Sequence, residues 1–154
     1  MEDNLDPNDK SFWLDKKKNV DKIWYGLIII CALTVVADLF YQLLSLNNVP
    51  VASIGTLGIK FKDKILKTGL TSPDTISIHK YLQIIKKNKI DNVIIEASSH
   101  GLDQTRLHHI NYKAAIFTNF SQDHLDYHKN MKSYLNSKLI LFKKILQKNS
   151  RIVT

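Results

Sequence analysis

A scarcity of cysteine and arginine limits what this 154-residue chain can do. The single cysteine, Cys31, supports neither a disulfide framework nor a zinc site built from several thiolates. The formal charge of +8 is typical of nucleic-acid binding. However, the two arginines, Arg106 and Arg151, lie far apart in the sequence, and the lysines of residues 60–89 and 129–148 are mostly single positions. We therefore expect no nucleic-acid partner, and attraction to anionic phosphates or lipid headgroups fits the charge better.

The N-terminal part divides into a polar tail and a long apolar stretch. Residues 1–22 are polar and mixed in charge, and we expect them to form a tail. Residues 23–46 carry one charged side chain, Asp38, and a helix of about 20 apolar residues is long enough to span a bilayer. Trp24 and Tyr41 near its two ends fit interfacial aromatic positions. The pattern predicts a transmembrane helix over 23–46 in contact with membrane lipid. Its topology stays open, and a buried helix is the alternative.

The remainder alternates short apolar runs with helical patterns. Strands are predicted at Val51–Ile54, Val93–Ala97 and Ala114–Thr118, with another beginning at Arg151. These runs are rich in β-branched residues, as in parallel strands buried on both faces. A helix is predicted to begin with Ser72 as its N-cap, and a longer one to span Met131–Gln147. Residues 49–154 are therefore expected to form an α/β domain with an incomplete doubly wound parallel sheet.

Ionisable residues gather where the predicted strands end. Glu96 closes the second strand, where burying a carboxylate is costly unless it is paired or bound to a metal. Asp123, His124, Asp126 and His128 follow the third strand. Carboxylate and imidazole together suit Mg²⁺ or Mn²⁺ beside phosphate better than a closed zinc site. A capping or core role for His124, and a structural turn at His128, stay open as alternatives.

One lysine stands out in the last predicted helix. Lys138 lies on the same helix face as Tyr134, Leu135 and Phe142, where leucine would be expected. A lysine at such a position either extends its ammonium group to solvent or has a specific function.

The run G-T-L-G-I-K at residues 55–60 looks superficially like a phosphate-binding loop. In that loop glycine, lysine and a hydroxyl residue are contiguous. Here Ile59 separates Gly58 from Lys60, and Phe61 stands where the hydroxyl is needed. We therefore interpret this run as something other than a nucleotide loop.

Several segments resemble, in order and spacing, the central domain of the Mur ligases, most closely the MurE type. They are V-A-S-I-G-T-L-G-I, T-G-L-T-S-P-D-T-I, I-E-A-S-S-H-G-L-D-Q-T-R, F-T-N-F-S-Q-D-H-L-D-Y-H and Y-L-N-S-K-L-I-L-F. The resemblance covers residues 49–154. It implies a cytoplasmic, ATP-dependent amide ligase that adds a diamino acid to UDP-MurNAc-dipeptide during peptidoglycan synthesis.

The resemblance also implies roles for individual residues. The substrate contacts would be Thr71, Ser72, Ser98, Gln104 and Arg106. Glu96 and His124 would hold Mg²⁺ between ATP and substrate, and Lys138 would be carbamylated, act in catalysis and hold a second Mg²⁺. Asn119 and Asp123 would support the ATP side of the reaction.

The sequence also departs from the family pattern. The Gly-Thr-Asn-Gly-Lys-Thr/Ser loop expected upstream of Val51 is replaced by the apolar stretch, and Leu70 stands where asparagine is common. The flanking family domains are not recognisable. Since positioning and charge stabilisation supply most of phosphoryl transfer, we expect no turnover by this chain alone.

Other interpretations stay open from the sequence. One is a membrane-tethered, non-catalytic module that binds a cell-wall precursor or a partner. Another is a metal-dependent hydrolase built on Glu96, His124 and Asp126. Supply of the missing ligase domains by another chain also stays open.

Overall fold

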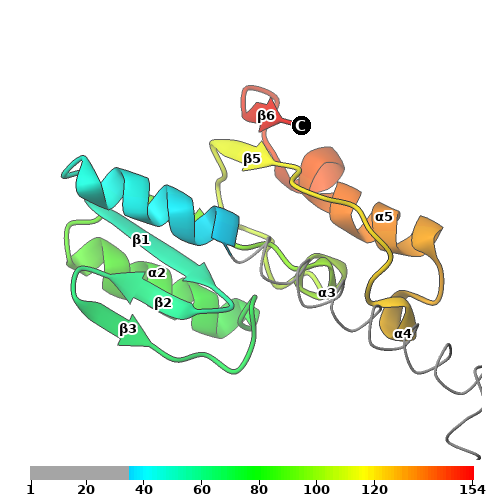
Figure 1. The fold of residues 1–154 in the computed structure, drawn as a ribbon, viewed down its shortest axis with the longest axis horizontal. Coiled ribbons are helices and arrows are strands. Elements are labelled where there is room, and N and C mark those ends of the chain that lie inside the picture. The colour runs from blue at the N-terminus through cyan, green and yellow to red at the C-terminus, as the bar shows by residue number, and fades with distance from the viewer. Residues whose placement is uncertain (1–34) are drawn as a thin grey trace, which may run out of the picture. The chain divides into compact units, whose positions relative to one another are not determined.

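The computed structural model describes residues 35–154, which fall within one compact unit, Leu33–Thr154. This part contains a four-stranded sheet, a separate two-stranded sheet and several helices (Figure 1). The strands are β1 (Val51–Gly55), β2 (Gly58–Phe61), β3 (Lys64–Leu66), β4 (Asn92–Ile95), β5 (Ala114–Ile116) and β6 (Arg151–Val153). The helices are residues 35–46, α2 (Thr75–Lys87), α3 (Ser99–Asp103), α4 (Leu125–His128), α5 (Met131–Ile140) and the π-helical η1 (Leu141–Ile145).

The larger sheet is mixed, with the strand order β3-β2-β1-β4. β1 runs parallel to β4, with Val51 opposite Asn92, and antiparallel to β2. β5 and β6 form the second, parallel pair. The prediction of a wholly parallel sheet is therefore wrong, because β1, β2 and β3 follow one another as antiparallel neighbours. Gly55 pairs with Gly58 across a tight turn, so the run at residues 55–60 is a hairpin rather than a phosphate loop.

The predicted transmembrane helix is also wrong for the part of the chain that the structure describes. Within residues 35–154, no helix is both long enough and apolar enough to cross a membrane. Asp38, the charged residue of the apolar stretch, forms an ion pair of 2.5 Å with Lys60 on β2. Tyr41 donates a hydrogen bond to the backbone carbonyl of Lys62 at 3.3 Å. The helix over 35–46 thus contacts the β2–β3 hairpin, while residues 1–34, with the predicted tail and the rest of the stretch, lie outside the described residues.

The two longer predicted helices are present with changed boundaries. Asp74, rather than Ser72, is the N-cap of α2, and its side chain accepts a hydrogen bond from the Ser77 amide at 3.0 Å. α5 begins at Met131 as predicted and continues directly as η1 to Ile145. α3 and α4 were not predicted, since each is too short for a hydrophobic period to show.

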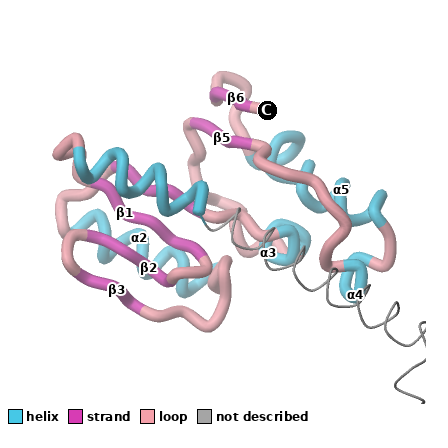
Figure 2. The backbone as a smooth tube through the Cα atoms, viewed as in Figure 1, coloured by secondary structure: helices cyan, strands magenta, loops and turns pink. Residues whose placement is uncertain are grey.

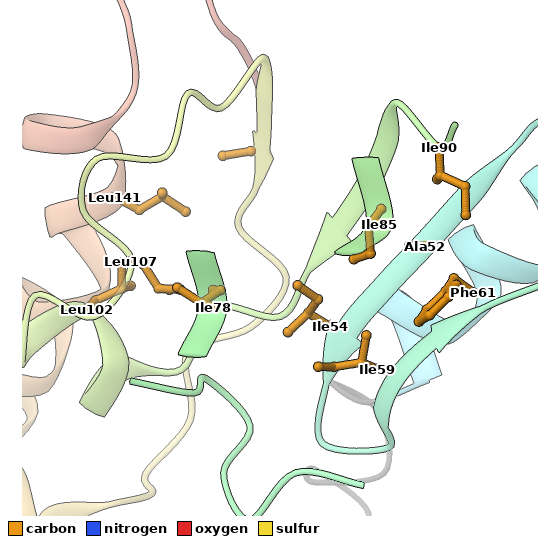
Figure 3. Packing of buried hydrophobic residues seen from close by; sticks show 11 residues of the cluster. Ala52, Ile54, Ile59, Phe61, Ile78, Ile85, Ile90, Leu102, Leu107 and Leu141 are labelled. Carbon is orange, nitrogen blue, oxygen red and sulfur yellow. The ribbon is translucent and has the colours of Figure 1, made fainter. Parts of the chain in front are cut away.

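A continuous apolar core links the elements of both sheets. In Figure 3, Ile78 of α2 lies between Ile54 of β1 on one side and Leu102 and Leu107 on the other. The cluster comprises Ala52, Ile54, Ile59, Phe61, Ile78, Ile85, Ile90, Leu102, Leu107, Ala115 and Leu141. Burial of these side chains stabilises the positions of the loops after β4 and β5, drawn in pink in Figure 2, which carry the candidate site.

Candidate functional site

The loop before α2 carries Ser72, whose side chain is a centre of hydrogen bonds. Ser72 is 1% exposed. Its hydroxyl donates to the Glu96 carbonyl at 3.1 Å and accepts from the amide and hydroxyl of Ser98, at 3.1 and 3.0 Å. Ser98 in turn caps α3 by accepting a hydrogen bond from the Gly101 amide at 3.0 Å. A Cβ at Gly101 would lie 2.6 Å from the Ser72 Cβ, so this close approach requires glycine.

Glu96, directly after β4, has partners for both carboxylate oxygens. The Thr56 amide donates to Oε2 at 2.8 Å, and the Thr56 hydroxyl donates to Oε1 at 3.1 Å. The Thr56 hydroxyl also lies 2.9 Å from the Thr71 hydroxyl. A Cβ at Gly55 would come within 2.6 Å of Glu96 Oε2. The carboxylate that the sequence left without an obvious partner is therefore held by the turn between β1 and β2.

Arg106 and Gln104 connect the Ser72 loop to α4. Arg106 Nη1 donates to the Ser72 carbonyl at 3.0 Å, and Nη2 donates to Gln104 Oε1. Gln104 Nε2 donates to the Tyr127 hydroxyl at 3.1 Å, which donates to Asp103 Oδ2 at 2.9 Å. Because Arg106 is only half-buried, its guanidinium can also present N–H groups to a carboxylate or phosphate.

The buried side chain of His128 joins α3 to α5. Its Nε2 lies 2.9 Å from the Ser99 hydroxyl, and its Nδ1 lies 3.4 Å from the Ser137 hydroxyl. The ring stacks on Tyr134 with a centroid distance of 5.2 Å. Burial lowers the pKa of His128, although the nearby charge of Asp103 acts in the opposite direction. The neutral imidazole, with one donor and one acceptor nitrogen, suits this pair of hydroxyl partners.

Lys138 lies partly buried against aromatic rings, as its place on the apolar face predicted. Its ammonium group donates to the backbone carbonyl of Asn119 at 2.8 Å. It also lies 5.0 Å from the Tyr134 ring centroid and 5.7 Å from that of Phe117. Burial lowers the pKa of Lys138, while the negative charge of Asp123 partly opposes this. The neutral fraction, which is the nucleophilic form of an amine, is thereby increased.

Asp123, whose charge acts on Lys138, is followed by His124 in the loop before α4. The Asp123 carboxylate accepts a hydrogen bond from the His124 amide at 2.8 Å, and His124 Nε2 is 3.4 Å from its other oxygen. His124 has a left-handed backbone with φ 56° and occupies the N-cap position of α4 without capping it through its side chain. Its ring meets His100 edge to face at 4.9 Å. The pKa of His100 is lowered mainly by burial, and to a smaller extent by the neighbouring His124 and His128.

The described residues do not complete a metal site. Within residues 35–154, no group of three or more His, Cys, Asp or Glu side chains is close enough to hold an ion. Glu96 is bonded to Thr56, whereas His124 contacts Asp123 and His100. The hydrolase built on Glu96, His124 and Asp126 therefore lacks a three-ligand cluster in this part of the chain. The assignment of Glu96, His124 and Lys138 to magnesium stays a prediction.

The predicted residues thus fall into two groups. The Ser72 group contains Thr71, Ser72, Glu96, Ser98, Gln104 and Arg106, joined by hydrogen bonds. The Lys138 group contains Asn119, Asp123, His124 and Lys138. The sequence interpretation placed Thr56 among the polar residues at the strand ends without assigning it a role, and it missed Asp103 and Tyr127. Each lies inside one of the motifs quoted above, but spacing along the chain does not reveal which motifs meet in space.

Comparison with known proteins agrees with the motifs. A family model described as the Mur ligase middle domain matches residues 34–154. A UDP-N-acetylmuramoyl-L-alanyl-D-glutamate--2,6-diaminopimelate ligase from Leptospira interrogans serogroup Icterohaemorrhagiae serovar copenhageni (strain Fiocruz L1-130) is 40% identical over 109 residues, 71% of this chain and 22% of that protein. The ligase of the same name from Wigglesworthia glossinidia brevipalpis is 42% identical over 112 residues, 73% of this chain and 23% of that protein.

The structure of this chain is also similar to a solved structure of a ligase with this name. It has a TM-score of 0.63 and 31% sequence identity, and the match covers 70% of this chain and 22% of that one. The chain therefore spans less than a quarter of the length of these relatives.

Proposed function

Because this chain belongs to the Mur ligase family, we propose that it provides the substrate-facing part of a MurE-type middle domain. The family is ATP-dependent, and the relatives are named for joining 2,6-diaminopimelate to UDP-N-acetylmuramoyl-L-alanyl-D-glutamate. We propose this substrate and this amine for the complete protein, in the cytoplasmic synthesis of peptidoglycan.

The Ser72 group is the observation that carries the proposal. The substrate bears phosphates and carboxylates, and the half-buried Arg106 offers the planar donor fork that such groups pair with. Thr71, Ser98 and Gln104 add hydroxyl and amide groups around it. Ser72 is buried and its hydroxyl already has partners, so its contribution is to hold the surrounding groups in place.

The Lys138 group supports a second role. A desolvated amine with a lowered pKa can attack CO₂ as a free base, forming an N–C bond and releasing one proton to give a carbamate. We propose Lys138 as this carbamate, with Asn119 and Asp123 as its neighbours. A magnesium ion, when bound, would neutralise charge on phosphate oxygens. The described residues supply carboxylate and imidazole groups for it without forming the complete site.

We propose that residues 1–154 by themselves bind the sugar-peptide without converting it. The sequence contains no contiguous Gly-Lys-Ser/Thr for the phosphates of ATP. Without that loop, much of the positioning needed for phosphoryl transfer is missing.

Calorimetric titration of the purified chain with UDP-MurNAc-L-Ala-D-Glu tests this proposal. We expect a Kd between about 10 μM and 1 mM, with no ADP formed on addition of ATP and diaminopimelate. Arg106→Lys, which keeps the charge but loses the fork, should weaken binding by about tenfold. Arg151→Ala, which removes the exposed arginine of β6, is the matched control and should bind as the parent chain does. Absence of binding, or equal loss in both variants, would contradict the proposal.

A further inference from the structure

We infer that Thr56, in the turn between β1 and β2, is a positioning residue for the substrate site. Its side chain holds the Glu96 carboxylate and the Thr71 hydroxyl in a fixed relation to each other. The inference rests on the proposed function, because its consequence is an effect on sugar-peptide affinity.

Thr56 contacts Glu96 through two separate donors. The backbone amide reaches Oε2 at 2.8 Å and the hydroxyl reaches Oε1 at 3.1 Å, so both oxygens of the carboxylate are fixed by one residue. A threonine hydroxyl has a single proton. Since that proton is directed to Glu96, the Thr56 oxygen accepts the proton of Thr71 across the 2.9 Å contact. One hydroxyl thereby sets the orientation of two side chains that belong to different segments.

The turn itself leaves little freedom for Thr56. Gly55 pairs with Gly58 on either side of it. A Cβ at Gly55 would lie 2.6 Å from Glu96 Oε2, and one at Gly58, where φ is +93°, would lie 2.5 Å from the Leu66 carbonyl oxygen. A side chain at position 55 would therefore displace the Glu96 carboxylate, whereas position 58 requires glycine because of both its backbone conformation and its contact with the backbone. The turn thus constrains the backbone at Thr56, and the hydrogen bonds to Glu96 and Thr71 orient its exposed side chain.

The effect of Thr56 is separable from that of the buried serine next to Thr71. Ser72 bonds to Glu96 through the backbone carbonyl and to Ser98, and none of these contacts involves Thr56. Removing the Thr56 hydroxyl should therefore release Thr71 and one oxygen of Glu96 while leaving the Ser72 contacts in place. This separation distinguishes positioning from a general loss of folding.

Valine and serine at position 56 make the matched pair of variants. Thr56→Val keeps the shape and the backbone amide but removes the hydroxyl, whereas Thr56→Ser keeps the hydroxyl. We expect Thr56→Val to bind UDP-MurNAc-L-Ala-D-Glu about 3- to 10-fold more weakly than the parent, as for a lost hydrogen bond, and Thr56→Ser to restore affinity to within about 2-fold. Thr75→Val, at the start of α2, removes a hydroxyl with no hydrogen bond among the described residues and controls for the substitution itself.

A second measurement needs no ligand. In ¹³C-methyl spectra of the free protein, Thr56→Val should shift the Thr71 methyl resonance, while Thr56→Ser and Thr75→Val should leave it close to its parent position. An unmoved Thr71 resonance, or affinity unchanged by Thr56→Val, would overturn the inference while leaving the proposed function intact. Failure of the parent chain to bind the sugar-peptide rejects the proposed function instead, and a Thr71 shift confined to Thr56→Val would then still establish the contact.

Discussion

The Ser72 group and the Lys138 group hold their polar atoms in different ways. In the Ser72 group, side chains from three segments bond to one another or to neighbouring backbone carbonyls. Ser98 donates to the Ser72 hydroxyl, the Ser72 hydroxyl and Arg106 donate to the backbone carbonyls of Glu96 and Ser72, and Thr56 holds the Glu96 carboxylate. In the Lys138 group, the amine has one hydrogen bond, to the Asn119 carbonyl, and otherwise lies near the rings of Tyr134 and Phe117. The first arrangement orders donors and acceptors before a ligand arrives. The second removes an amine from water and so changes its reactivity.

This difference predicts where the protein is sensitive to substitution. Each hydrogen bond is worth only about 1 kcal/mol net, but leaving a buried partner unsatisfied costs about 1–3 kcal/mol. The buried serine Ser72 has several such partners, whereas Lys138 has one. Substitutions in the Ser72 group should therefore lower the free energy of unfolding, whereas substitutions in the Lys138 group should chiefly change the reactivity of the amine.

Gly101→Ala is expected to give the largest effect. The added Cβ would lie 2.6 Å from Ser72 Cβ and 2.8 Å from Ser72 Oγ, so α3 must move away from the loop that it packs against. We expect the free energy of unfolding to fall by about 2–3 kcal/mol, measured by urea denaturation, because overpacking outweighs the helix propensity of alanine. Gly69→Ala is the matched control, since an added Cβ there meets nothing within 4 Å. If the two variants were equally stable, close packing around Ser72 would not matter for folding, and the expected difference between the Ser72 group and the Lys138 group would be contradicted.

Much of the α/β pattern was predictable because it depends on local sequence. The strands at Val51 and Ala114 begin where their apolar runs begin, and α5 begins at Met131. Helical periodicity placed Lys138 on the same helix face as Tyr134, but it left open whether the amine extends to solvent or is buried, as it partly is. Membership of the Mur ligase family, inferred from ordered motifs, was confirmed by the comparisons.

What could not be predicted depends on contacts between distant segments. The apolar stretch before Asn47 suggested a membrane helix because nothing in the sequence shows that Asp38 pairs with Lys60, on a strand that was itself missed. Likewise Glu96 called for a partner, but its identity as Thr56, far away in sequence, requires the pairing of β1 with β4. Hydrophobic periodicity carries no information about either contact.

Acidification tests His128, the residue that joins α3 to α5. Burial lowers the pKa of His128 in the folded chain, so the unfolded chain takes up a proton first as the pH falls below about 6.5. The contribution of His128 to the free energy of unfolding should therefore be largest near pH 7.5 and should decrease as the pH falls below about 6.5. We expect His128→Gln to be less stable at pH 7.5 by about 1 kcal/mol, and to lose less stability than the parent between pH 7.5 and 5.5, as measured by urea denaturation.

Other titrating groups can be separated from this effect. Hydrogen bonds lower the pKa values of Asp38, Asp74 and Asp91, so these carboxylates lose their contribution only at more acidic pH. His100, whose pKa is also lowered by burial, remains in the variant and should leave part of the dependence in place. An identical pH dependence in His128→Gln and in the parent would show that the link between α3 and α5 does not depend on a neutral imidazole.

Lys138→Met is expected to have the smallest effect on stability. It therefore tests most directly whether the Lys138 group, unlike the Ser72 group, contributes little to folding. Methionine fills a similar volume beside Tyr134 and Phe117, and the lost bond to the Asn119 carbonyl is offset by no longer burying an amine. We expect the free energy of unfolding to change by less than about 1 kcal/mol. In ¹³CO₂-equilibrated protein, a carbamate resonance should be present in the parent and in Lys132→Met, an exposed position on the same helix, and absent in Lys138→Met. A loss of more than about 2 kcal/mol would instead mean that the amine is part of the folded framework, as the serine hydroxyls are.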